Sequence, residues 1–183
     1  MSAEEIRARW EEELKAVVGR MRAGGGRPGI ADASLIASKT GLERLQGLLS
    51  GEVPYAPIAD TFGFALIEIA AGRAVFQGTP QFAHYNPNGT VHGGWYATLL
   101  DSAVGCAVQS TLPAGRVYVT VELGMNIVRA ASHETGPLRA IAHVVHSGRQ
   151  LATAEGRIVG PDERLYATAT TTCIVSEIAR RPA

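Results

Sequence analysis

Apolar side chains recur every three or four residues at the start of the chain, the spacing that places them on one face of a helix. The stripe consists of Ile6, Trp10, Leu14, Val17 and Met21. A glycine-rich segment over residues 23–29 then interrupts the pattern and is typical of a flexible linker. Residues 1–40 are therefore predicted to form an N-terminal helical extension with a linker, and no function is assigned to them.

A second helix is predicted to begin after Thr40. Thr40 and Glu43 have the spacing of a capping box, and Gly51 is typical of a helix end. Leucines at positions 42, 45, 48 and 49 form the apolar stripe between these signals. We expect the main domain to begin here and to cover residues 41–178.

From Phe62 onward the pattern changes to that of strands. Segments 64–69 and 74–79 flank a short glycine-containing turn and predict a hairpin. A polar loop over residues 80–91 leads to a long helix, about Gly93 to Leu112. Because this helix is apolar nearly all round, it is predicted to be buried.

Four further strands are predicted near residues 117–128, 138–146, 151–159 and 165–175. The short turns between them favour antiparallel pairing. Three of the strands carry alanine pairs on one face. These pairs are Ala140 and Ala142, Ala152 and Ala154, and Ala167 and Ala169. Small side chains let a helix lie close, so we predict an α+β fold in which an antiparallel sheet of five to six strands wraps around one long central helix.

The balanced charge of the chain limits the classes of partner that it is expected to bind. The 183 residues contain 17 Lys and Arg against 17 Asp and Glu, so no basic surface for nucleic acid or anionic membrane is expected. Cys106 and Cys173 lie in apolar segments, which is typical of buried thiols in a reducing compartment. The sequence shows neither a signal peptide nor an apolar run of the roughly 20 residues that span a membrane. We therefore expect a cytoplasmic protein.

Asp101 lies two turns inside the apolar helix, too far in to cap its N-terminus. Aspartate is a poor residue for a helix interior, and a carboxylate among apolar neighbours costs free energy unless it is paired or hydrogen-bonded. One interpretation is a catalytic base or nucleophile. The other is a structural carboxylate that caps a neighbouring strand or joins an interface salt bridge.

The tripeptide His92-Gly93-Gly94 lies where the polar loop enters the helix. Backbone N–H groups without intrahelical partners occur there, at the positive end of the helix dipole. Glycine allows a ligand to approach the backbone, so such an N–H could polarise a carbonyl as an oxyanion hole does. The Asn86 amide could donate to the same carbonyl or orient the histidine. Taken alone, these residues equally fit an ordinary glycine-rich helix start and a turn asparagine before Pro87.

The run from Asn86 to Asp101, NPNGTVHGGWYATLLD, resembles the motif of the PaaI-like branch of hotdog thioesterases. The resemblance extends over about residues 41–176 and includes TLPAG at 111–115, TVEL at 120–123 and ATTTC at 169–173. It departs where family members often have Arg-Pro and this chain has Arg129-Ala130. Residues 1 to about 40 have no counterpart in the family core.

The resemblance implies a role for each residue of the motif. In that family the asparagine and the first glycine N–H hold the thioester carbonyl, the acid is base or nucleophile, and a nearby Ser or Thr helps to place water. These roles would fall on Asn86, Gly93, Asp101 and Thr120, with His92 supporting the Asn86 loop.

The spacing within the helix adds an argument of its own. Gly93 and Asp101 are eight residues apart, about 12 Å along a helix axis. A carbonyl held at Gly93 then cannot come within the roughly 3–3.5 Å of the same helix's Asp101 that attack requires. If two copies of the helix lie antiparallel, Gly93 of one copy can face Asp101 of the other. The site is therefore predicted to be shared across a two-fold dimer, and assembly into tetramers stays open.

Further candidates contact the substrate in this hypothesis. Gly94, Trp95 and Tyr96 open the helix, with core packing the alternative for the two aromatic residues. In the family, the turn that carries Arg149 lies near the CoA nucleotide. Arg149 is thus a candidate phosphate contact, or else a solvated turn arginine.

No metal site is predicted. By residue type alone His143 and His146 suggest one, but their odd separation on a strand places them on opposite faces.

We therefore predict an acyl-CoA thioesterase that hydrolyses its substrate to free acid and CoA with no cofactor. Whether Asp101 attacks directly or activates water stays open, as does the acyl group. A non-catalytic acyl-CoA-binding protein would keep the fold and the pocket without turnover. An enoyl-CoA hydratase would need an Asp/His pair on one subunit to position water, whereas here the helix start carries His-Gly-Gly and the acid follows two turns later.

Overall fold

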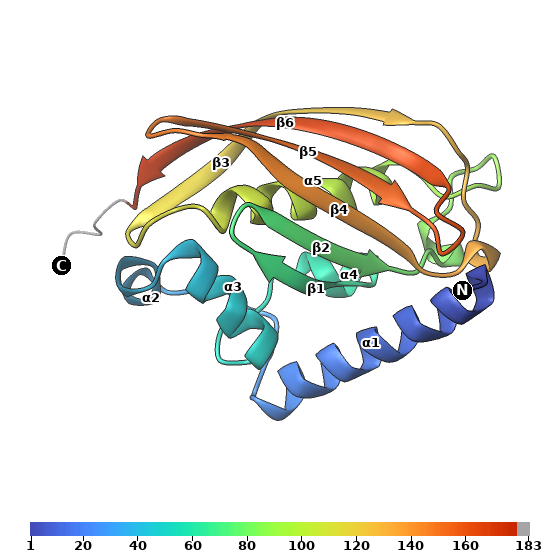
Figure 1. Cartoon of the computed structure of the whole chain (residues 1–183), viewed down its shortest axis with the longest axis horizontal. Helices are drawn as coiled ribbons and strands as arrows, with labels where there is room; N and C mark the ends of the chain where they lie inside the picture. Colours follow the sequence, from blue (N-terminus) through green and yellow to red (C-terminus); the bar gives the residue numbers. More distant parts are fainter. Residues whose placement is uncertain (179–183) are drawn as a thin grey trace.

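The computed structural model describes residues 1–178. A six-stranded antiparallel sheet of order β1-β2-β4-β5-β6-β3 curves around helix α5 (Gly93–Gln109) (Figure 1). The strands are β1 (Phe64–Ala70), β2 (Arg73–Gly78), β3 (Arg116–Ile127), β4 (Leu138–Ser147), β5 (Leu151–Val159) and β6 (Leu165–Glu177). The predicted α+β hotdog architecture, with its central helix, is confirmed.

Small side chains let α5 lie close to the sheet. All six alanines of the predicted strip are buried. On the same strip, a Cβ added at Gly156 would lie 3.0 Å from Val104 Cγ1 of α5. The predicted close packing of helix on sheet is therefore confirmed.

Two details of α5 differ from the sequence prediction. The helix ends at Gln109 rather than Leu112, because the backbone N–H groups of Thr111 and Leu112 bond carbonyls three residues back instead of four, just before Pro113. The helix is also not buried all round. One stripe is only partly covered, and it consists of Ala97, Thr98, Asp101, Ser102, Cys106 and Gln109.

A glycine inside a strand is typical of a bulge, so the sequence predicts one at Gly124, but the bulge of β3 lies elsewhere. Gly124 keeps regular register opposite Thr170 of β6, and the register shift falls between Thr120 and Glu122. Val121 is therefore the extra residue. A bulge re-aims the neighbouring side chains, and this one adjoins Thr120.

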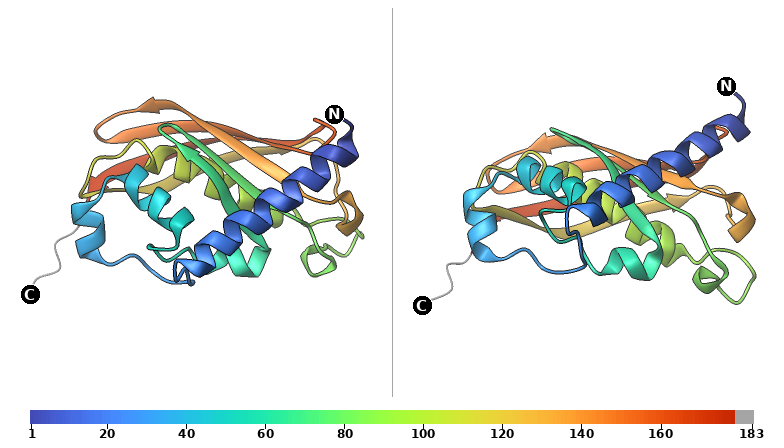
Figure 2. Two further views of the ribbon diagram at one scale, coloured as in Figure 1. Left: turned by 60° about the horizontal axis from the view of Figure 1, so that its bottom comes forward. Right: turned by 90° about the horizontal axis from the view of Figure 1, so that it is seen from below.

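Four helices precede the sheet (Figure 2); the first, third and fourth contact β1, and the second contacts the third helix and β3. They are α1 (Ala3–Ala23), α2 (Ala33–Ser38), α3 (Gly41–Ser50) and α4 (Ile58–Phe62). The capping box at Thr40 and the left-handed Gly51 that ends α3 are confirmed. The short helices α2 and α4 were not predicted, because they hold too few residues for a periodic stripe.

Helix α1 is docked on the sheet. Its buried residues are Trp10, Val17 and Met21, three positions of the predicted stripe. The Trp10 carbonyl accepts a hydrogen bond from Gln77 Nε2 of β2 at 3.1 Å, and the Arg139 guanidinium of β4 lies 4.3 Å from the Trp10 ring centroid. The division at residue 40 stays a prediction, but α1 shares its packing with the sheet.

No helix within residues 1–178 combines the length and apolar character that a membrane span requires.

Candidate active site

Asp101 and Thr120 meet between α5 and β3. The Thr120 hydroxyl donates to Asp101 Oδ1 with 3.1 Å between the oxygens. Both side chains are half-buried, so Asp101 is less enclosed than its apolar sequence neighbours suggest. The bulge at Val121 directly follows Thr120. The strand thus holds a hydroxyl against the carboxylate, which fixes one carboxylate oxygen.

The thiol of Cys106 and the phenol of Tyr118 are two of the ionisable groups near this carboxylate. Burial, with a smaller contribution from the Asp101 charge, raises the pKa of the Cys106 thiol to about 12. Burial, followed by Cys106 and Asp101, also holds the pKa of the Tyr118 phenol well above its usual value. Both groups stay protonated near neutral pH. Neither supplies a thiolate or phenolate nucleophile beside Asp101.

The helix start presents one unused donor. His92 caps α5, and its Nδ1 accepts from the Gly94 N–H at 2.8 Å. Among residues 1–178 no atom accepts from the Gly93 N–H. Gly93 is partly exposed, and its N–H lies at the positive end of the helix, a position suited to hold a carbonyl oxygen.

The Asn86 side chain folds its own loop. Its Oδ1 accepts from the Asn88 N–H at 2.9 Å and the Thr90 N–H at 3.3 Å, and its Nδ2 donates to Thr90 Oγ1 at 2.9 Å. The His92 N–H closes the loop by donating to the His84 carbonyl at 2.8 Å. One amide hydrogen of Asn86 is therefore engaged within the loop and the other is left to donate elsewhere.

One chain does not bring the two halves of the candidate site together. Helix α5 is continuous from Gly93 to Gln109, so Gly93 and Asp101 remain about 12 Å apart along its axis. The structure thus places Asp101 with Thr120, and Gly93 with His92, at two separate points of one helix.

The residues predicted to contact the substrate lie partly in the core and partly at the surface. Trp95 and Tyr96 are buried in the core. The Trp95 indole N–H donates to the Phe62 carbonyl at 3.0 Å, and the Tyr96 hydroxyl donates to the Arg129 carbonyl at 3.3 Å. They are core residues and do not line the cavity beside Asp101. Arg149 lies exposed in the turn between β4 and β5, and Gly94 is engaged by His92.

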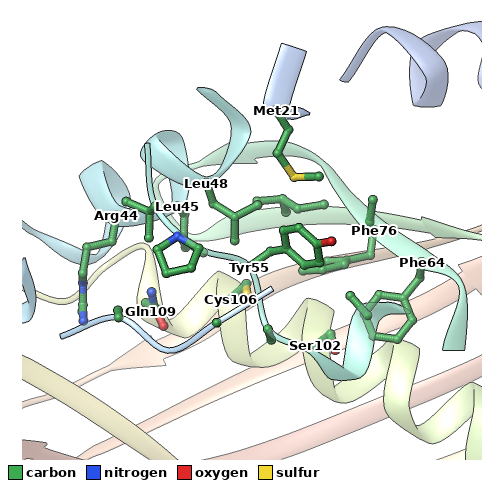
Figure 3. A pocket seen from close by; sticks show the side chains of 18 of the residues that line it. Met21, Arg44, Leu45, Leu48, Tyr55, Phe64, Phe76, Ser102, Cys106 and Gln109 are labelled. Atoms are coloured by element: carbon green, nitrogen blue, oxygen red, sulfur yellow. The ribbon is translucent and has the colours of Figure 1, made fainter. Parts of the chain in front are cut away.

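A cavity of about 700 Å³ adjoins Asp101. Its lining includes Asp101, Ser102 and Cys106 from α5, and Arg44, Leu45 and Leu48 from α3 (Figure 3). Sequence reasoning named none of the three α3 residues as site residues. One signal was present, because Arg44 interrupts the leucine stripe of this helix four residues before Leu48.

Within residues 1–178, no three His, Cys, Asp or Glu side chains are grouped closely enough to hold a metal ion.

Known proteins resemble this chain in sequence and in structure. The family model described as Thioesterase superfamily matches residues 88–167. A phenylacetic acid degradation-related protein of Ralstonia eutropha JMP134 is 31% identical, with a TM-score of 0.66, and the match covers 72% of this chain and 98% of that chain.

Two curated relatives agree with this assignment. A Halobacterium salinarum protein described as a "putative esterase" is 40% identical over 80 residues, 43% of this chain, and the match spans only 51% of that protein. The 1,4-dihydroxy-2-naphthoyl-CoA hydrolase of Listeria monocytogenes is 23% identical over 66% of this chain and 96% of that enzyme. This chain therefore belongs to the hotdog-fold thioesterase superfamily, and its predicted likeness to the phenylacetic acid degradation proteins is confirmed.

Proposed function

We propose that this protein hydrolyses an acyl-CoA thioester to a free acid and CoA, at a site completed by a second copy of the chain. The observation that carries the proposal is the Thr120–Asp101 hydrogen bond beside a large apolar cavity. A carboxylate held by a hydroxyl is suited to accept a proton from water or to attack a carbonyl carbon.

In the proposed reaction the Gly93 N–H of one copy polarises the thioester carbonyl, and Asn86 lies in the loop that leads to it. Asp101 of the other copy acts as base or nucleophile, with Thr120 orienting it. The C–S bond breaks, CoA leaves as the thiol, and the acyl carbon takes the oxygen of water. These steps draw on groups of the chain alone, so no cofactor is proposed.

Two features support a shared site. Strand β3 is an edge strand of twelve residues, with Val119 61% and Val121 53% exposed. A long, uncovered, apolar edge is a template for pairing with another strand. The partly covered stripe of α5 runs beside it and contains Asp101. A two-fold pair joined through β3 would bring two α5 helices side by side in opposite directions, so that Gly93 of one faces Asp101 of the other.

The choice of CoA as carrier rests on the Listeria relative, which is named for a CoA thioester. Exposed Arg149 is the proposed contact for a CoA phosphate. We place the reaction in the cytoplasm because Cys106 and Cys173 are both unpaired thiols.

A thiol-release assay tests the proposal. Wild-type protein is incubated with a panel of acyl-CoA thioesters that differ in chain length and aromatic character, and free CoA is titrated with a thiol reagent. We expect release from at least one thioester, and loss of that release in Asp101→Asn. Binding of acyl-CoA without release across the panel would instead identify a non-catalytic acyl-CoA-binding protein.

A further inference from the structure

The N-terminal helices form the roof of the cavity beside Asp101. Among the first 40 residues, seven with apolar side chains line it, namely Leu14, Val17, Val18, Met21, Ile30, Ala31 and Ile36. In Figure 3 the Met21 side chain reaches down from α1 toward the cavity, with Leu48 of α3 and Tyr55 nearby. The cavity is therefore built jointly by the sheet, α5 and the N-terminal extension.

Arg44 is the unusual residue of this lining. It is 5% exposed, and one of its terminal nitrogens donates to the Arg116 carbonyl at 3.0 Å. Its Nε is buried and has no hydrogen-bond partner, and no carboxylate within residues 1–178 forms an ion pair with it. A buried donor of a charged group is costly when it is unpaired. A ligand oxygen would remove this cost.

Arg44 and Asp101 mark two ends of the cavity. Figure 3 shows Arg44 and Gln109 at one end and Phe64 and Ser102 at the other, and Asp101 precedes Ser102 on α5. From Asp101 to Gln109 is about 12 Å along the helix. An extended chain spans roughly 3.5 Å for every three bonds, so about ten bonds cover this distance.

We propose that this cavity takes the acyl group of the thioester, and that the preferred acyl group has an apolar body about ten carbons long with an oxygen acceptor at its far end, which Arg44 binds. This inference rests on the proposed function, because it places the thioester carbonyl at Asp101. It gives the N-terminal extension a role in choosing the substrate.

The chemistry of the lining suits such a group. Pockets of roughly 300–1,000 Å³ lined mainly by apolar residues with a few polar groups bind ligands of this size. The cavity has this character, with Leu48 and Phe76 between its two ends, Phe64 at the Ser102 end and the guanidinium of Arg44 at the other. A carboxylate would form a charge-assisted pair with Arg44, whereas a hydroxyl would accept a single hydrogen bond.

Three CoA thioesters of equal length test the proposal, those of decanoic, 10-hydroxydecanoic and decanedioic acid. We expect wild type to show kcat/KM at least about tenfold higher for an oxygen-ended thioester than for decanoyl-CoA. Arg44→Leu should lower kcat/KM for the oxygen-ended thioesters about tenfold more than kcat/KM for decanoyl-CoA. Arg44→Gln keeps a neutral donor, so it should preserve a preference for the hydroxyl and abolish one for the carboxylate.

Equal losses on all three thioesters in Arg44→Leu would show that Arg44 only ties α3 to β3, and would overturn the proposal. The proposal would also be overturned if wild type had the same kcat/KM for all three thioesters. The Arg20→Leu variant, an exposed arginine of α1 outside the cavity, is the control and should change nothing.

A second pair of variants covers the case in which Arg44 variants do not fold. Val18→Trp narrows the cavity from α1, so it should lower kcat/KM for the ten-carbon thioesters about tenfold more than for butanoyl-CoA. Ala16→Trp is exposed on the same helix and should change neither. Equal effects of Val18→Trp on long and short thioesters would contradict the placement of the acyl group.

Calorimetric titration with free decanedioic and decanoic acids separates this inference from the proposed hydrolysis. Binding of the diacid that Arg44→Leu abolishes, in a protein that releases no CoA, would support the cavity and contradict the thioesterase. Release of CoA from short acyl-CoA without selective binding of the diacid would contradict the cavity alone.

Discussion

Thr120 on β3 and Asp101 on α5 share a hydrogen bond of 3.1 Å, and Val121, the bulged residue of β3, comes directly after Thr120. Edge strand, bulge and central helix thus converge on one carboxylate. The bond fixes one Asp101 oxygen, while Asp101 also lines the cavity. In the proposed reaction the two residues have separate tasks, since the carboxylate of Asp101 would react and the hydroxyl of Thr120 would position it.

Asp101→Asn should fold normally and lose hydrolysis by a factor on the order of 10² or more, at or above the low end for removing a positioned acid–base group. Asparagine keeps the shape of the half-buried side chain and its Oδ1 can still accept from Thr120, so thermal unfolding should change little. CoA release and melting temperature are measured on the same preparation. Near wild-type turnover in a well-folded variant would remove Asp101 from the mechanism.

Thr120→Val removes the hydroxyl and keeps the volume. We expect kcat to fall about tenfold with KM little changed, because a hydrogen bond to a charged group contributes about 1.5–3 kcal/mol and Thr120 acts through Asp101. Thr120→Ser should restore most of kcat, since serine supplies the same donor. An effect of Thr120→Val on KM alone would show that the hydroxyl serves substrate binding rather than the carboxylate.

The pH dependence of stability reports on the surroundings of Cys106. Burial raises the pKa of its thiol from 9.0 to about 12. At a pH between these values the thiol stays neutral in the folded chain, whereas it ionises in the unfolded chain. The corresponding stability is fully present below pH 9.0 and is lost as pH rises toward 12. The melting temperature of wild type should therefore fall more steeply over this window than that of Cys106→Ala. Parallel curves would indicate that the thiol is solvated.

The sequence predicted the fold well where its signals were local and long. Helix α5 and the alanine strip followed from composition and period alone, and Asp101 stood out as a carboxylate inside an apolar helix. The bulge was misplaced because Gly124 was chosen by residue type, whereas a bulge depends on how β3 pairs with β6, some 50 residues later. Arg44 was missed for the same reason, since its burial depends on contacts that α3 makes with β3.

Edge strand β3 provides a test of the proposed dimer. Val121→Lys places a charge on the bulge of the exposed edge, which should weaken pairing with a second copy. We expect the dimer dissociation constant to rise about tenfold, equivalent to ~1.4 kcal/mol, in sedimentation experiments. Val121 is already exposed in a single chain, so folding should be preserved.

Val145→Lys is the matched control, because Val145 is also an exposed valine at a register shift, in β4 rather than at the sheet edge. It should leave assembly unchanged. Equal effects of the two variants would show that β3 is not the contact, and a fully active monomer would contradict the shared site altogether.

Mixing two inactive variants tests the shared site directly. Gly93→Val blocks the proposed carbonyl donor and Asp101→Asn removes the acid, so each homodimer should be inactive. In a mixed dimer both lesions fall on one site, and the other site has neither. About half the dimers in an equal mixture are mixed and each has one intact site of two, so roughly a quarter of wild-type activity should return. This requires that subunits exchange freely and that the two sites act independently.

Subunit exchange is measured with differently tagged chains alongside CoA release. Demonstrated exchange without recovered activity would mean that Gly93 and Asp101 do not serve one thioester from two chains. The 12 Å between them on α5 would then exclude one of the two from the mechanism.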